Sequence, residues 1–113
     1  MNESQSPTYL IYGAGAIGSV LGGFLHKINR PVTFAGRGSH LLAIREQGLR
    51  ITGIWGEHLV PPEEIDIHSD PLNGERRFST ILLSVKSKDT ETAAREAAAF
   101  LAEDGIMVSI QNG

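Results

Sequence analysis

Apolar residues along this chain gather in short runs that are separated by longer amphipathic stretches. The runs at residues 8–12, 32–35 and 78–85 are rich in apolar, β-branched or aromatic side chains and have the length of buried strands. Residues 106–110, which follow Gly105, predict a last strand of the same kind. The run at 78–85 is almost continuously apolar, which is typical of a sheet that is covered on both faces.

Helical patterns lie between these runs. The stretch 13–28 predicts a helix that opens on a glycine-rich turn, and 40–47 predicts a second helix. In a third predicted helix the apolar residues share one face, and they are Ala93, Ala94, Ala97, Ala98 and Leu101. Strands that alternate with helices require a parallel sheet with right-handed crossovers. The pattern therefore predicts a doubly wound, mostly parallel α/β domain with about five strands.

The remaining segments are less regular. Residues 49–60 alternate weakly between apolar and polar and predict one or two short strands. The polar segment 61–77 leaves room for a short strand at 65–68, and residues 1–7 form a polar lead-in. A single domain is therefore expected to span residues 8–113.

Composition narrows the class of protein. The chain has 113 residues, 41% of them hydrophobic and 20% charged, which fits one globular domain. A net charge of −3 does not indicate a nucleic-acid-binding protein. No apolar run approaches membrane-spanning length. The absence of cysteine excludes disulfides and thiolate chemistry, and the start lacks the features of a signal peptide. The four histidines have no metal-ligand spacing. We therefore expect a cytoplasmic protein that binds neither nucleic acid, membrane nor metal.

The first predicted strand is followed by a motif of the form G-x-G-x-x-G, made of Gly13, Ala14, Gly15, Ala16, Ile17 and Gly18. Its context is that of a dinucleotide site, with a strand before it, a helix after it and a second strand about twenty residues on. Gly13 permits a tight turn, Gly15 lets the backbone approach a pyrophosphate, and Gly18 lets helix and strand pack closely. The helix N-terminus would attract the phosphates. The motif predicts a Rossmann-like domain; the alternative is a structural turn without a ligand.

The end of the second predicted strand favours NADP(H) over NAD(H). Sites that prefer NAD(H) carry an acidic residue there, which bonds the ribose 2′-hydroxyl. This chain has Ala35-Gly36-Arg37-Gly38 instead. The planar guanidinium of Arg37 is suited to a 2′-phosphate, whereas the alternative is an arginine on an exposed loop.

Two further polar residues follow later strands. Lys86 is the first charged residue after the run 78–85, and Asn112 follows the last predicted strand. Ligands of open α/β sheets bind outside the carboxyl ends of the strands, so Lys86 is expected near the ribose or nicotinamide of the cofactor. The amide of Asn112 can both donate and accept hydrogen bonds. Taken alone, each residue is better interpreted as ordinary: Lys86 as a solvated loop lysine and Asn112 as a turn residue.

Together these pieces resemble the ketopantoate reductase family. The resemblance rests on GAGAIG after the first strand, GR after the second, VK after the long apolar run and QNG after the last strand. It extends over residues 9–113 and covers the amino-terminal domain of the family. The resemblance implies that Arg37 binds the 2′-phosphate and that Lys86 and Asn112 line the nicotinamide and substrate cleft. It also implies a helical second domain that is absent from this chain.

The family consists of 2-dehydropantoate 2-reductases of pantothenate biosynthesis. The resemblance therefore implies hydride transfer from NADPH to the ketone of 2-dehydropantoate, which gives pantoate. In the family a lysine of the second domain supplies the proton. This chain is thus expected to be a fragment that binds NADP(H) but turns over poorly or not at all.

Two alternatives remain open from the sequence. The chain could be a stand-alone NADP(H)-binding or sensor module, or the domain of a related NADP-dependent 2-hydroxyacid dehydrogenase or 6-phosphogluconate-type dehydrogenase. A domain that lacks its partner should leave an apolar face beside its last strand, whereas a sensor should have a polar edge. Self-association into a homo-oligomer through such a face is a further expectation.

Overall fold

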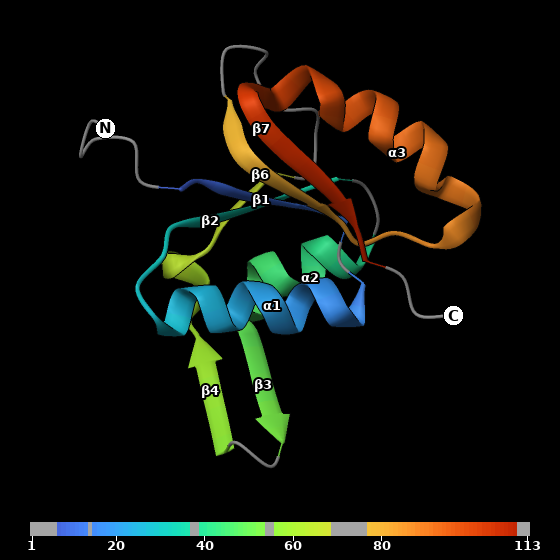
Figure 1. Ribbon diagram of the computed structural model, residues 1–113. Helices are drawn as coiled ribbons and strands as arrows, with labels where there is room; N and C mark the ends of the chain where they lie inside the picture. Colours follow the sequence, from blue (N-terminus) through green and yellow to red (C-terminus); the bar gives the residue numbers. More distant parts are fainter. Residues whose placement is uncertain (1–6, 14, 37–38, 54–55, 69–76, 111–113) are drawn as a thin grey trace.

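A twisted parallel sheet forms the centre of the molecule in the computed structural model, which describes residues 7–13, 15–36, 39–53, 56–68 and 77–110 (Figure 1). Within these residues the sheet has five strands in the order β5-β2-β1-β6-β7, and every neighbouring pair is parallel. The strands are β1 (Tyr9–Tyr12), β2 (Val32–Ala35), β5 (Asp66–His68), β6 (Phe78–Leu83) and β7 (Leu101–Ser109). The chain runs outward from β1 in one direction to β5 and in the other to β7.

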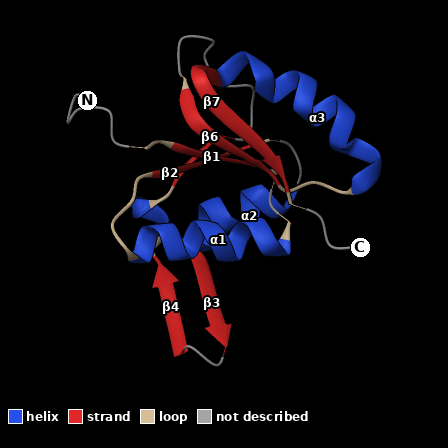
Figure 2. Ribbon diagram, in the orientation of Figure 1, coloured by secondary structure: helices blue, strands red, loops and turns tan. Residues whose placement is uncertain are grey.

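Helices cover both faces of this sheet (Figure 2). On one side lie α1 (Ala16–Lys27) and α2 (Ser39–Gln47), and on the other lies α3 (Thr90–Ala97), which ends in the short 3-10 turn η3 (Ala98–Phe100). The doubly wound α/β architecture and the five strands are thereby confirmed, including the short strand at 65–68, which is β5.

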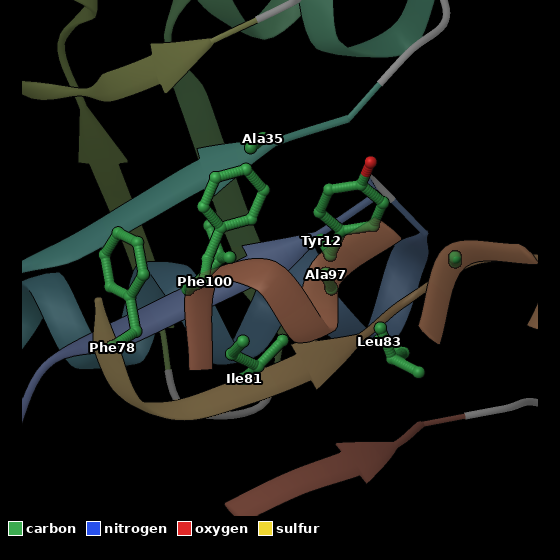
Figure 3. Packing of buried hydrophobic residues seen from close by; sticks show 9 residues of the cluster. Tyr12, Ala35, Phe78, Ile81, Leu83, Ala97 and Phe100 are labelled. Carbon is green, nitrogen blue, oxygen red and sulfur yellow. The ribbon is translucent and has the colours of Figure 1, made fainter. Parts of the chain in front are cut away.

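Alternation along the strands produces two cores. On β1, Leu10 and Tyr12 face α3, whereas Ile11 faces α1 and α2, because successive strand residues point to opposite faces. The core on the α3 side contains Leu10, Tyr12, Ala35, Phe78, Ile81, Leu83, Ala93, Ala97 and Phe100 (Figure 3). The other core contains Ile11, Phe34, Leu41, Ile44, Leu49, Ile51 and Val60.

An antiparallel hairpin extends from the α1 side of the molecule. It consists of β3 (Leu49–Gly53) and β4 (Gly56–Val60), as the weak alternation predicted, and the short 3-10 turn η1 (Pro62–Glu64) follows it. Helix α1 packs on this hairpin and on β2 through Gly22 and Gly23. A β-carbon at Gly22 would collide with the ring of Phe34, and one at Gly23 would collide with Ile51. Close packing therefore explains two glycines inside a helix.

The predicted start of the last strand is wrong. Strand β7 begins at Leu101 rather than at residue 106, and Leu101 pairs with Phe78 instead of ending the helix. The register between β6 and β7 is irregular at its start: Phe78 faces Leu101, but Thr80 already faces Ile106. The extra residues form a bulge that contains Gly105. Leu101 continues the apolar spacing of α3, so the pattern did not reveal that the helix ends before it.

Strand β7 forms one edge of the sheet and carries apolar side chains that face solvent. Ile106 is 60% exposed and Val108 is 42% exposed. Both lie on the same face because they are two residues apart in a strand. An exposed apolar face beside the last strand is thus present. Among the described residues, no helix has the length and apolar character needed to cross a membrane.

Candidate functional site

The order in which the chain adds strands reverses between β1 and β6, and open α/β sheets bind their ligands at this point. The chain leaves β1 toward β2 on one side, while β6 and β7 lie on the other side. The carboxyl ends of these parallel strands meet at one edge. Gly13 follows β1, Gly36 follows β2 and Ser84 follows β6.

The glycine turn, residues 13–18, is tied to both neighbouring strands. The N–H of Gly13 donates to the carbonyl of Ala35 over 2.8 Å, and the N–H of Gly15 donates to the carbonyl of Ser84 over 3.1 Å. Gly13 has a φ of 103°, a backbone conformation that residues other than glycine rarely adopt. Ala14 lies outside the described residues. Gly13 and Gly15 are therefore hydrogen-bonded to the backbone on both sides of β1.

Ser84 packs against the glycine turn. Its side chain is buried, and its Oγ accepts a hydrogen bond from the N–H of Gly18 over 3.1 Å. A β-carbon added to Gly13, Gly15 or Gly18 would press against Ser84. The three glycines of the motif therefore share one neighbour, which directly follows β6.

The N-terminus of α1 is suited to an anion. No side chain caps the helix at Gly15, and its first turn contains no acidic residue. The N–H groups of Ala16 and Ile17 lie in the first turn of the helix, where they have no partner within the helix itself. Together with the helix dipole these donors favour a phosphate.

A cleft of about 230 Å³ adjoins the turn, between the sheet edge and α3. Its lining residues are Tyr12, Gly13, Gly36, Val85, Asp89, Thr92, Ala93 and Glu96. The hydroxyl of Tyr12 donates to Oε1 of Glu96 over 2.6 Å. The volume is below the roughly 300–1,000 Å³ of pockets that enclose a whole drug-sized ligand, so the cleft suits one part of a dinucleotide.

Of the other predicted site residues, the structure describes only Lys86. Lys86 is exposed and does not line the cleft, although the preceding Val85 does. The carbonyl of Lys86 accepts the N–H of Asp89 over 2.8 Å and thereby closes the short 3-10 turn η2 (Ser87–Asp89). Arg37 and Asn112 lie outside the described residues. Arg37 directly follows Gly36, which lines the cleft.

Sequence reasoning missed the contributions of Ser84, Tyr12 and Glu96. The available signal for Ser84 was a polar residue at the end of an apolar run, immediately before the VK pair. Nothing in the local sequence of Tyr12 or Glu96 indicates that they meet, since 84 residues separate them.

A second polar cluster lies away from this edge. His26 of α1 contacts His58 over 3.2 Å and Glu64 over 2.8 Å, beside the hairpin. Among the described residues, no group of three or more histidine, aspartate or glutamate side chains is arranged to hold a metal ion. The glycine turn and its cleft are therefore the candidate site.

Comparison with known proteins gives a consistent picture. The family model described as "Ketopantoate reductase PanE/ApbA" matches residues 9–113. The chain is 35% identical over 103 residues to the 2-dehydropantoate 2-reductase of Pyrococcus horikoshii and equally so to that of Archaeoglobus fulgidus. These matches cover 91% of this chain but 32% and 31% of the two relatives. The chain thus spans about a third of the length of the curated relatives it matches.

Solved structures share the fold. A PanE/ApbA family ketopantoate reductase from Ralstonia eutropha superposes with a TM-score of 0.76 at 33% identity, covering 94% of this chain and 34% of that one. The D-mandelate dehydrogenase solved with NADH and anilino(oxo)acetate superposes with the same TM-score and coverage at 24% identity, a likeness that shows the fold alone.

Proposed function

Because the chain belongs to the ketopantoate reductase family, we propose that residues 8–113 are the NADPH-binding domain of a 2-dehydropantoate 2-reductase. The observation that carries the proposal is the glycine turn, fixed on Ser84 beside a cleft at the reversal point of the sheet. The reaction is the reduction of 2-dehydropantoate to pantoate, with NADPH as the hydride donor.

The residues of the turn fit a pyrophosphate. Gly13 and Gly15 provide backbone without side chains, and the first turn of α1 offers N–H donors with no acidic side chain nearby in the helix. Backbone donors of this kind are already oriented before the ligand arrives, so little conformational entropy is lost on binding. In this proposal Gly13 to Gly18 bind the two phosphates.

The two halves of the dinucleotide then extend to opposite sides of the turn. The adenosine half lies toward β2, in the cleft beside Gly36, and Arg37 pairs with the 2′-phosphate. The nicotinamide half lies toward β6 and β7, where Lys86 and Asn112 follow their strands. These two residues would position the nicotinamide and the ketone of the substrate.

The proton for the nascent alkoxide is assigned to the second domain of the family. Backbone and side chains of this chain bind and orient the dinucleotide, but the proposal gives none of them the role of general acid. We therefore expect the 113-residue chain alone to bind NADPH without appreciable reduction of 2-dehydropantoate.

A stand-alone NADP(H)-binding module is the second candidate. It predicts the same cofactor affinity but a polar outer edge. The exposed Ile106 and Val108 on β7 favour the reductase domain, because neighbouring apolar side chains exposed on one face suit packing against further structure. A related NADP-dependent 2-hydroxyacid dehydrogenase domain would bind the same cofactor but a different keto acid, so binding assays with 2-dehydropantoate distinguish it.

The cofactor assignment is tested by titrating the chain with NADPH and NADH. Wild type should bind NADPH more tightly, and Arg37→Ala should weaken NADPH binding by roughly tenfold or more, the effect of losing a charge-assisted pair. In Arg37→Ala the affinity for NADH should change by less than about twofold, because NADH lacks the 2′-phosphate with which Arg37 would pair.

Arg50→Ala on the hairpin is the matched control, since Arg50 pairs with Glu57 and does not line the cleft. Equal weakening of NADPH and NADH by Arg37→Ala would contradict the assignment. Failure of wild type to bind either dinucleotide would overturn the proposed function as a whole.

A further inference from the structure

Two residues that line the cleft, a tyrosine and a glutamate, are hydrogen-bonded to each other. Tyr12 is the last residue of β1, and its ring is buried in the α3-side core with Ala97 (Figure 3). Its hydroxyl donates to Oε1 of Glu96 over 2.6 Å, the length of a hydrogen bond to a charged acceptor. Because the ring is fixed by packing, the hydroxyl fixes the carboxylate of Glu96 at the cleft.

The cleft is chemically asymmetric. One wall is the α3 side, where Thr92 and Glu96 are four residues apart and share one helix face, and where Asp89 lies just before the helix. The other wall is the backbone of Gly13 and Gly36. The polar wall is therefore rich in acceptors and negatively charged. It repels phosphate groups and favours a partner that donates hydrogen bonds.

Among the parts of a dinucleotide, the adenine base matches this wall. Its faces are apolar and its exocyclic amino group is a donor. The cleft spans the ends of β2 and β6, since both Gly36 and Val85 line it. The nicotinamide carboxamide also donates, but the proposed function places it toward β7 and Asn112, and the adenosine half in the cleft beside Gly36. We propose that Glu96, positioned by Tyr12, recognises the amino group of adenine and selects adenine over hypoxanthine dinucleotides. This inference rests on the proposed function.

The test compares NADPH with reduced nicotinamide hypoxanthine dinucleotide phosphate, in which a carbonyl oxygen replaces the amino group and the adjacent ring nitrogen N1 gains a hydrogen. The hydroxyl of Tyr12 holds the carboxylate of Glu96 at the position of the amino group, so we expect that carboxylate not to move to the N1–H. In wild type that oxygen would face the carboxylate of Glu96, so NADPH should bind about tenfold more tightly or better. Glu96→Gln should reduce the preference to within about threefold, because an amide can donate to the carbonyl as well as accept from the amine.

Tyr12→Phe separates the positioning role from packing. It keeps the ring in the core but removes the hydroxyl, so the preference for adenine should fall while the unfolding midpoint stays within a few degrees of wild type. Glu91→Gln is the control on the same helix, since Glu91 pairs with Arg95 over 2.6 Å and does not line the cleft. It should keep the full preference.

Equal affinity of wild type for both dinucleotides, or an unchanged preference in Glu96→Gln, would overturn the inference and leave the proposed function standing. An unchanged preference in Tyr12→Phe would overturn the positioning role of Tyr12. Failure of wild type to bind either dinucleotide would overturn the proposed function and the inference together.

Discussion

The hydroxyl of Ser84 lies against the glycine turn and leaves no room for a β-carbon at Gly15 or Gly18, while the backbone of Ser84 leaves none at Gly13. The hydroxyl also accepts the N–H of Gly18, a first-turn donor that has no acceptor within its own helix. Ser84 thus restricts these three positions to glycine and also satisfies one N–H of the turn.

Ser84→Ala should therefore lower the stability of the domain more than a serine-to-alanine change elsewhere. It leaves the buried N–H of Gly18 without its acceptor, which should reduce the free energy of unfolding by about 1–3 kcal/mol. Urea denaturation followed by circular dichroism measures this. Ser109→Ala, at an exposed residue of β7, is the control and should change stability by less than about 0.5 kcal/mol. Indistinguishable curves for the two variants would show that Ser84 contributes nothing special.

At the level of elements, α1 packs more closely on its neighbours than an ordinary helix because of Gly22 and Gly23. Glycine in a helix interior is about 1 kcal/mol less favourable than alanine. Alanine in place of either glycine would favour the helix, but its β-carbon would collide with Phe34 at residue 22 or with Ile51 at residue 23. Phe34 is almost completely buried, so its ring has little room to move aside.

Gly22→Ala should destabilise the domain by about 1–3 kcal/mol, the usual result of overpacking a core, although helix propensity alone predicts a gain. Thermal unfolding of Gly22→Ala, Phe34→Leu and the double variant forms a double-mutant cycle. The smaller side chain of leucine should relieve the collision, so the double variant should be more stable than the sum of the single effects. A higher unfolding midpoint in Gly22→Ala would refute the packing explanation.

The sequence was informative about elements where local pattern decides them. The apolar runs predicted β1, β2 and β6 because buried strands of a parallel sheet require such runs. The bulge at Gly105 was not predictable in this way, since it depends on pairing between β6 and β7. Contacts of Ser84 and Tyr12 with residues far away in the sequence were equally hidden. The roles of Arg37 and Asn112 remain predictions.

At the scale of the whole molecule, the edge strand β7 is a surface to which further structure or another chain could bind. Ile106 and Val108 expose apolar side chains on one face, and an edge strand offers unpaired backbone groups to another chain. Both features promote association between copies unless further structure covers them.

The 113-residue chain should accordingly self-associate as its concentration rises, and Ile106→Thr with Val108→Thr should reduce this. Threonine retains β-propensity, so the fold should persist while the apolar contact is lost. Sedimentation velocity at several concentrations measures the change. Leu59→Thr, at an exposed leucine of β4, is the control and should leave association unaltered. A wild-type chain that stays monomeric throughout would contradict the expectation.

The attachment of the glycine turn to both neighbouring strands has a consequence for folding. The contact between Gly18 and Ser84 closes a separation of 66 residues, so it forms only after β6 has joined the sheet. Local helix formation takes about a microsecond, whereas contacts between distant segments must first overcome the entropy of closing the loop. During synthesis the complete glycine motif therefore emerges well before the strand that shapes it. The dinucleotide site that we propose would therefore be completed late, by assembly of the sheet rather than by the motif alone.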